Sequence, residues 1–185
     1  MFEQTYLKVD FTVNPFKNGE YESCIFKNCI FSGINLSGSQ FIDCEFIGCN
    51  LSLASTFKSS FQQVRFIDCK MLGLRFDKCE PIGLSFEFKN VILDHASFYQ
   101  CKINQTIFRD CKMCEVDFTE TELAGASFFN CDLSGSIFEN TKLEKADLRT
   151  AYNYHIDPES NKLKKAKFSL QGLPGLLDKY GIEIE

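Results

Sequence analysis

The sequence predicts a repeat solenoid, because it carries a strict five-residue period with one large and one small position in each repeat. Across residues 88–148 every fifth residue is large and apolar, and from Val91 onward the residue two places earlier is small or β-branched. An α-helix has a period of 3.6 and a β-strand a period of 2, so neither explains a period of five. A fixed short period indicates a repeat architecture. The large residues are Phe88, Leu93, Phe98, Ile103, Phe108, Met113, Phe118, Leu123, Phe128, Leu133, Phe138, Leu143 and Leu148.

This pattern resembles the pentapeptide-repeat family, whose motif is a small residue, often Asp or Asn, then Leu or Phe, and two variable residues. Clear copies occur at residues 116–118 (Val-Asp-Phe), 131–133 (Cys-Asp-Leu) and 146–148 (Ala-Asp-Leu). The resemblance implies an all-β fold, a right-handed quadrilateral parallel β-helix. Four pentapeptides then form one coil, so residues twenty apart stack, with coils about 4.8 Å apart. On this arrangement Lys102, Glu122 and Lys142 form one column of alternating charge.

Composition limits the class of protein. The chain has 185 residues and a net charge of −5, which fits one domain and argues against a general nucleic-acid-binding surface. No apolar run reaches the length of a membrane span, and the N-terminus does not resemble a signal peptide. We therefore expect a cytoplasmic protein that makes no direct contact with nucleic acid or membrane.

The ten cysteines fit the repeat better than a disulfide framework or a metal site. All but Cys114 occupy the small inward position, where a free cysteine behaves as a small hydrophobe. Cysteines in one column, such as Cys29 and Cys49, would have Cβ atoms nearly a coil spacing apart. That separation exceeds the ~3.8 Å mean of a disulfide, so we predict reduced thiols. We expect no metal and no cofactor.

The N-terminal segment, residues 1–22, is predicted to be a lead-in. Tyr6, Phe11, Phe16 and Tyr21 keep the register of the large position, but the residues two places before them are poor matches. We expect an imperfect strand or a cap over the first coil, since an open solenoid end exposes core and unpaired backbone.

The β-helix itself is predicted over residues 23–168, with two interruptions. Thr56 takes a large position and Phe57 is displaced by one, which predicts a local irregularity. Near residues 80–88 the register slips by two, and Pro81 cannot donate a backbone hydrogen bond. We expect a small bulge or loop at residues 80–83, with surface tolerance favoured over a binding role.

A longer turn is expected at residues 152–159, followed by a C-terminal helix and tail at residues 169–185. Pro174 suits a first helical turn and Gly181 a C-cap, and residues 182–184 offer a short strand. The apolar residues of this segment exceed what one coil end needs, so we expect capping combined with dimerisation across a two-fold axis. The alternative is that all of them cover the last coil. The expected dimer residues are Leu170, Leu173, Leu176, Leu177 and Tyr180.

The sequence offers no catalytic constellation. His95 and His155 are isolated in sequence, and we find no nucleophile elbow, phosphate loop or metal-binding cluster. We therefore expect a binding surface and no enzyme activity.

One candidate surface is acidic. Residues 115–147 hold eight acidic residues against Lys142 and Lys145, a net of six negative charges. Several acids on a rigid rod can present charge as duplex DNA presents phosphate. The alternative is a solvated face that keeps the protein soluble. The expected partner-binding residues are Glu115, Asp117, Glu120, Glu122, Glu139, Glu144 and Asp147.

The repeat, the acidic coils and the apolar ending together resemble the quinolone-resistance group of pentapeptide-repeat proteins and their mycobacterial relative. The resemblance implies a non-enzymatic, homodimeric rod, joined through its C-terminal ends, that mimics duplex DNA. Its partner would be DNA gyrase or topoisomerase IV, with fluoroquinolone protection. The plasmid-borne group carries two sizeable loops that matter for protection, whereas this chain has only the slip near Pro81 and an irregularity at Thr56. The alternative is a structural scaffold or adaptor rod that binds an unrelated protein.

Overall fold

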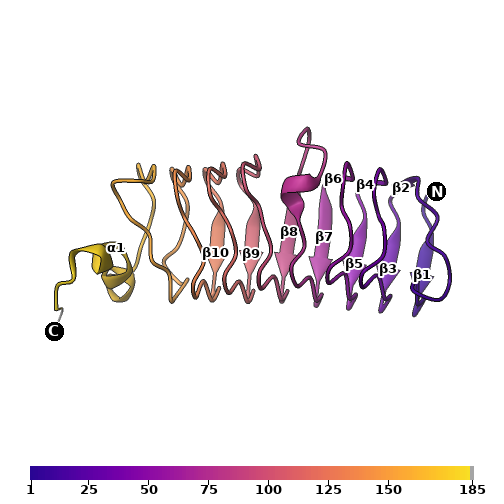
Figure 1. Cartoon of the computed structure of the whole chain (residues 1–185), viewed down its shortest axis with the longest axis horizontal. Helices are drawn as coiled ribbons and strands as arrows, with labels where there is room; N and C mark the ends of the chain where they lie inside the picture. The colour runs from indigo at the N-terminus through magenta and orange to yellow at the C-terminus, as the bar shows by residue number, and fades with distance from the viewer. Residues whose placement is uncertain (184–185) are drawn as a thin grey trace.

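The structure is a computed structural model that describes residues 1–183. It is a rod of stacked coils, with the N-terminus at one end and the short helix α1 at the other (Figure 1). The predicted strand at residues 182–184 extends outside the described residues, and Ile182 and Glu183 are not in a strand.

Short parallel strands form two sheets along the rod, which confirms the predicted β-helix. The seven-stranded sheet holds β1 (Thr5–Leu7), β3 (Ile25–Lys27), β5 (Glu45–Ile47), β7 (Val64–Ile67), β8 (Phe86–Lys89), β9 (Ile107–Arg109) and β10 (Ser127–Phe129). The three-stranded sheet holds β2 (Glu20–Glu22), β4 (Gln40–Ile42) and β6 (Ser60–Gln62). Isolated parallel bridges continue the ladder where the strands are too short to be named.

The register between coils is twenty residues, as predicted: Phe108 lies opposite Phe128, and Glu122 opposite Lys142. Each coil has four faces, numbered here by the inward residue that each carries in one coil. Face 1, the seven-stranded sheet, holds Phe108, face 2 holds Met113, face 3 holds Phe118 and face 4 holds Leu123. All four side chains are fully buried.

The core is a set of side-chain ladders along the rod axis. Phe108 stacks on Phe88 with ring centroids 5.1 Å apart and on Phe128 with centroids 5.0 Å apart. The cysteines fill the small positions, and all ten, each within the described residues, are free thiols. The Cys49 thiol donates to the carbonyl oxygen of Phe26 at 3.2 Å. Burial raises the pKa of the Cys44 thiol to about 11, so it is protonated at neutral pH.

The lead-in at residues 1–22 continues the ladder as an imperfect coil. Its strand β1 pairs in parallel with β3, and the ring of Tyr6 stacks on Phe26 at 4.8 Å. The rings of Tyr6, Phe11 and Phe16 pack on the core while remaining partly exposed. These rings cover the first complete coil.

The slip near Pro81 is an insertion of two residues into one coil. Phe66 pairs with Phe88, 22 residues later, where other coils pair residues twenty apart. The extra chain forms an exposed loop after the 3-10 turn η1 (Phe76–Lys78), and it projects from the rod in Figure 1. Both Phe86 and Phe88 stay buried, so the core absorbs the slip.

The irregularity at Thr56 concerns hydrogen bonding. Thr56 is buried and its hydroxyl donates to the carbonyl oxygen of Arg75, while the displaced Phe57 is 55% exposed. The neighbouring coil stays in register, since Asn35 still pairs with Ser55.

The C-terminal segment is helical in short pieces: η2 (Leu170–Gly172), α1 (Pro174–Leu177) and η3 (Asp178–Tyr180). Helix α1 begins at Pro174 as expected, and Gly181 ends η3 with a left-handed φ of 60°. Ser169 starts the segment by accepting a hydrogen bond from the Gly172 amide at 3.1 Å.

Candidate partner-binding surface

Four of the predicted acidic residues gather around face 3. Asp117 lies in a column between Ser97 and Ile137, directly beside the inward Phe118. Glu139 lies one coil further on, just after the inward Phe138. Glu115 and Glu120 lie at the corners on either side of this face. The four residues, named here the acidic strip, are Glu115, Asp117, Glu120 and Glu139.

The side-chain contacts of the acidic strip come from two neutral donors and one histidine. Gln100 Nε2 donates to Glu120 Oε2 at 2.9 Å, and the Thr119 amide donates to Asp117 Oδ1 at 2.9 Å. Glu115 Oε2 lies 3.2 Å from His95 Nδ1. Among residues 1–183, no lysine or arginine forms an ion pair with these four carboxylates.

The other three predicted acids lie on faces 4 and 1, and two of them, Glu122 and Asp147, are paired with basic side chains. Lys142 Nζ lies 2.7 Å from Glu122 Oε1, and this hydrogen bond holds the pKa of Glu122 below its usual range. Arg149 Nη2 lies 2.7 Å from Asp147 Oδ2 and likewise lowers the pKa of Asp147. Glu144 lies on the same corner as Lys164 of the following coil. The predicted acidic segment therefore divides by face.

A run of lysines occupies the next coil on the same two faces. Lys162 pairs with Lys142, and Lys167 pairs with Asp147, one coil further along the rod. Lys164 and Lys165 lie between them, and all four lysine side chains are exposed. The charge count over residues 115–147 stopped one coil too early to include them. The twenty-residue register, applied to residues 148–167, is the signal that finds them.

The predicted dimer residues divide into two groups. Leu176 packs against the core and Leu177 is half-buried. Leu170, Leu173 and Tyr180 point outward, with 81%, 40% and 54% of their surface exposed. The segment thus caps the last coil with one side and leaves apolar surface on the other.

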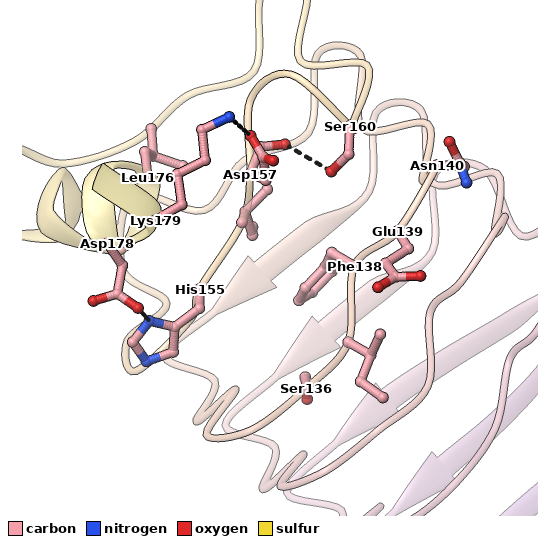
Figure 2. A pocket seen from close by; sticks show the side chains of 13 residues that line it. Ser136, Phe138, Glu139, Asn140, His155, Asp157, Ser160, Leu176, Asp178 and Lys179 are labelled. Atoms are coloured by element: carbon pink, nitrogen blue, oxygen red, sulfur yellow. Dashed lines mark hydrogen bonds and ion pairs between the residues drawn. The ribbon is translucent and has the colours of Figure 1, made fainter. Parts of the chain in front are cut away.

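Charged contacts attach this segment to the rod beside a cavity of about 460 Å³ (Figure 2). His155 Nδ1 lies 3.0 Å from Asp178 Oδ2. Lys179 Nζ lies 2.6 Å from Asp157 Oδ1 and 2.7 Å from Glu159 Oε2. Backbone pairing adds to these contacts, because the Ile156 amide donates to the Gly175 carbonyl at 2.8 Å.

Within residues 1–183 no three His, Cys, Asp or Glu side chains are grouped so as to hold a metal ion. Over the same residues, no helix has the length and apolar character needed to cross a bilayer.

Comparison with known proteins gives matches to one family. The sequence profile of the pentapeptide repeat region matches residues 19–87 and 84–168. No curated protein matches the sequence. The full-length structure of QnrB1, a plasmid-mediated fluoroquinolone resistance protein, shows 21% identity over 98% of this chain and 99% of that one, with a TM-score of 0.52. A trypsin-treated QnrB1 variant gives 21% identity over 100% and 99% of the chains, with a TM-score of 0.52.

A more distant structural match is HetL, a pentapeptide repeat protein involved in heterocyst differentiation regulation from the cyanobacterium Nostoc sp. strain PCC 7120. It shows 16% identity over 90% of this chain and 86% of that one, with a TM-score of 0.34. At such identities the likeness to QnrB1 concerns the fold.

Proposed function

Since this chain belongs to the pentapeptide-repeat family, we propose that it is a non-enzymatic protein whose acidic strip binds a type II topoisomerase in place of duplex DNA. The partner would be DNA gyrase or topoisomerase IV, in the cytoplasm. The observation that carries the proposal is the set of four carboxylates on one rigid face, none of them neutralised by lysine or arginine within residues 1–183.

The geometry of the strip supports mimicry of a phosphate backbone. Glu115, Asp117 and Glu120 lie across one coil and Glu139 lies on the next, about 4.8 Å further along the rod, so the strip presents a compact cluster of negative charge. DNA-binding proteins draw much of their affinity from closely spaced phosphate charges, and that affinity falls with salt. The four exposed lysines at residues 162–167 give faces 4 and 1 mixed charge at the same end of the rod. The proposed mimicry is therefore restricted to face 3.

The experiment is a gyrase supercoiling assay with rising protein concentration, with and without ciprofloxacin. We compare the wild type with a variant in which Glu115, Glu120 and Glu139 become Gln and Asp117 becomes Asn. The matched control changes Glu122 and Glu144 to Gln and Asp147 to Asn. We expect the wild type and the control to inhibit or protect gyrase at similar concentrations. The strip variant should need at least ~10-fold more protein, the loss expected when about 1.4 kcal/mol of binding is removed.

Two results would count against the proposal. Folded wild type that leaves supercoiling unchanged and shows no salt-sensitive binding to gyrase would exclude the partner. Equal losses in the strip variant and the control would exclude face 3 as the surface. The first result would leave the alternative of a scaffold rod whose protein partner is unrelated to topoisomerases.

A further inference from the structure

Face 3 loses its hydrogen-bonded ladder one coil before the other faces do. Along this face the inward residue donates to the next coil: the Phe98 amide bonds the Asp117 carbonyl at 2.8 Å and the Phe118 amide bonds the Ile137 carbonyl at 2.9 Å. The next coil in turn donates back, as the Ile137 amide does to Val116 at 2.9 Å. Among residues 1–183, neither the Phe138 amide nor the Ser136 carbonyl has a partner.

The chain leaves face 3 because of the sequence that follows. Pro158 stands twenty residues after Phe138, where the repeat calls for a large apolar side chain, and it is exposed. Ile156 turns inward instead and is buried, while its amide donates to Gly175. The Asp157 carbonyl, which would otherwise accept from Phe138, receives the Asn161 side chain at 2.9 Å.

The other three faces keep their ladder through this coil. Asp132 pairs with Tyr152 on face 2, Lys142 with Lys162 on face 4, and Asp147 with Lys167 on face 1. The gap is therefore confined to face 3.

The missing rung leaves the cavity of about 460 Å³ shown in Figure 2. We call it the notch. Its walls are the backbone of residues 136–138, the 155–160 segment and helix α1. Phe138, Ile156 and Leu176 give it an apolar lining, and Glu139 of the acidic strip stands at its edge.

We propose that the notch binds an extended peptide segment of a partner protein by β-strand addition. A carbonyl of the peptide accepts from the Phe138 amide, and an amide of the same peptide residue donates to the Ser136 carbonyl. The peptide thus replaces the missing rung. In each preceding coil a parallel strand bonds the equivalent amide and carbonyl, so a parallel peptide strand can bond the Phe138 amide and the Ser136 carbonyl with the same spacing. Extended peptides commonly join exposed sheet edges in this way.

Charge selects among peptides. Glu139 forms no ion pair among the described residues. It directly follows the inward Phe138, so in the regular register it faces the residue that directly follows the inward residue of an added strand. A lysine or arginine at that place pairs with Glu139. The proposal does not rest on topoisomerase binding, since the notch uses backbone groups that the acidic strip does not need.

The probe is a hexapeptide that repeats this chain's own rung, residues 135–140, with Lys in place of Glu139: acetyl-Gly-Ser-Ile-Phe-Lys-Asn-amide. Its matched control carries an N-methyl group on the isoleucine, which removes the donor to Ser136. Amide hydrogen exchange is followed by NMR for Phe138 and, as an internal reference, for Phe118.

We expect the Phe138 amide to exchange much faster than that of Phe118 in the free protein. Saturating peptide should slow Phe138 by at least ~10-fold and leave Phe118 unchanged, as one new hydrogen bond predicts. The N-methyl peptide should bind at least ~10-fold more weakly. Glu139→Gln should weaken binding several-fold, whereas Glu120→Gln at the corner of the same face should not.

The proposal fails if the peptide binds without slowing Phe138, if the N-methyl control binds equally well, or if no binding occurs at millimolar peptide. It also fails if Phe138 is already protected in the peptide-free protein and that protection grows with protein concentration. In that case a second copy of this chain fills the notch.

Discussion

The residue at each corner of a coil has a constrained backbone conformation that is not evident from its residue type. The residue two places after the inward position has a left-handed φ, as at Asn130 (53°), Asn140 (53°) and Lys145 (61°). Asn tolerates this region better than most residues, because its side chain bonds locally to the backbone. Leu53 adopts the same conformation, with φ of 58°, and is 71% exposed, so it carries the cost without compensating burial.

Leu53→Asn should therefore stabilise the protein. Relief of left-handed strain at a residue of this kind is worth about 1 kcal/mol in the free energy of unfolding. Urea unfolding followed by far-UV circular dichroism measures the change. Leu53→Ala is the control, since it trims the same side chain but gains no tolerance of positive φ. A variant no more stable than the alanine control would show that the corner is not strained.

The C-terminal segment is the element least dependent on the repeat. Its pieces η2, α1 and η3 contact the rod through the packing of Leu176 on the core, side-chain ion pairs, one backbone bond and the close approach of Gly172 and Gly175 to Tyr154. A Cβ at Gly175 would overlap the Tyr154 carbonyl and ring, so a glycine is needed here for the segment to pack closely against Tyr154. The segment can open without disturbing the hydrogen bonds between coils.

Acid should loosen this segment before it unfolds the rod. Lys179 lowers the pKa of Asp157 and of Glu159 in the folded protein. A lowered carboxyl pKa gives stability that is present above the unfolded value, about 3.9 for Asp and 4.3 for Glu, and is lost as pH falls through the folded value. The attachment should hold at pH 7 and weaken below about pH 4.

Hydrogen exchange read by mass spectrometry, at pH 7.0 and 3.5 after correction for intrinsic rates, measures this in residues 169–183. Lys179→Gln should lower protection at pH 7 and reduce the acid effect. His155→Gln keeps the Lys179 contacts and should retain the acid effect. Equal protection of the wild-type segment at both pH values would contradict the assignment.

At the scale of the whole molecule, the rod is asymmetric in charge and exposes apolar side chains at its C-terminal end. The acidic strip lies on face 3, lysines cover the last coil on faces 4 and 1, and Leu170 and Leu173 project from the end. Apolar surface at the end of a rod is satisfied most simply by a second copy across a two-fold axis.

We therefore predict a homodimer through the C-terminal ends. Light scattering after gel filtration should give twice the chain mass at micromolar concentration, and the double change of Leu170 and Leu173 to Asp should give the monomer. Ile82→Asp is the control, because Ile82 is 77% exposed on the loop far from that end, and it should remain dimeric. A wild type that is monomeric throughout would show that the segment only caps.

Much of this fold follows from the sequence, because each pentapeptide reports its own inward residues. The period located the ladder of Phe88, Phe108 and Phe128, and a shift in that period located the two-residue insertion after Pro81. The Pro174 start and the Gly181 end of the helical segment were also predictable, since both depend on local backbone preferences.

The candidate site was less predictable, because it depends on which residues meet across coils. Counting charge along the chain grouped Glu122 with Glu139, although within residues 1–183 stacking places a lysine against Glu122 and none against Glu139. The notch was not foreseen either. Pro158 marks a turn in sequence. The hydrogen bonds are needed to show that the Ile156 amide donates to Gly175 and that the Phe138 amide has no partner among residues 1–183.

The direction of the backbone hydrogen bonds has a mechanical consequence. The bonds between coils run along the rod axis, so a pull on the two ends stretches every layer of bonds in series and shears none of them. The layer with the fewest bonds then yields first, and the coils peel away one at a time from the end at residues 152–160. Under tension the protein would lengthen in steps of one coil each.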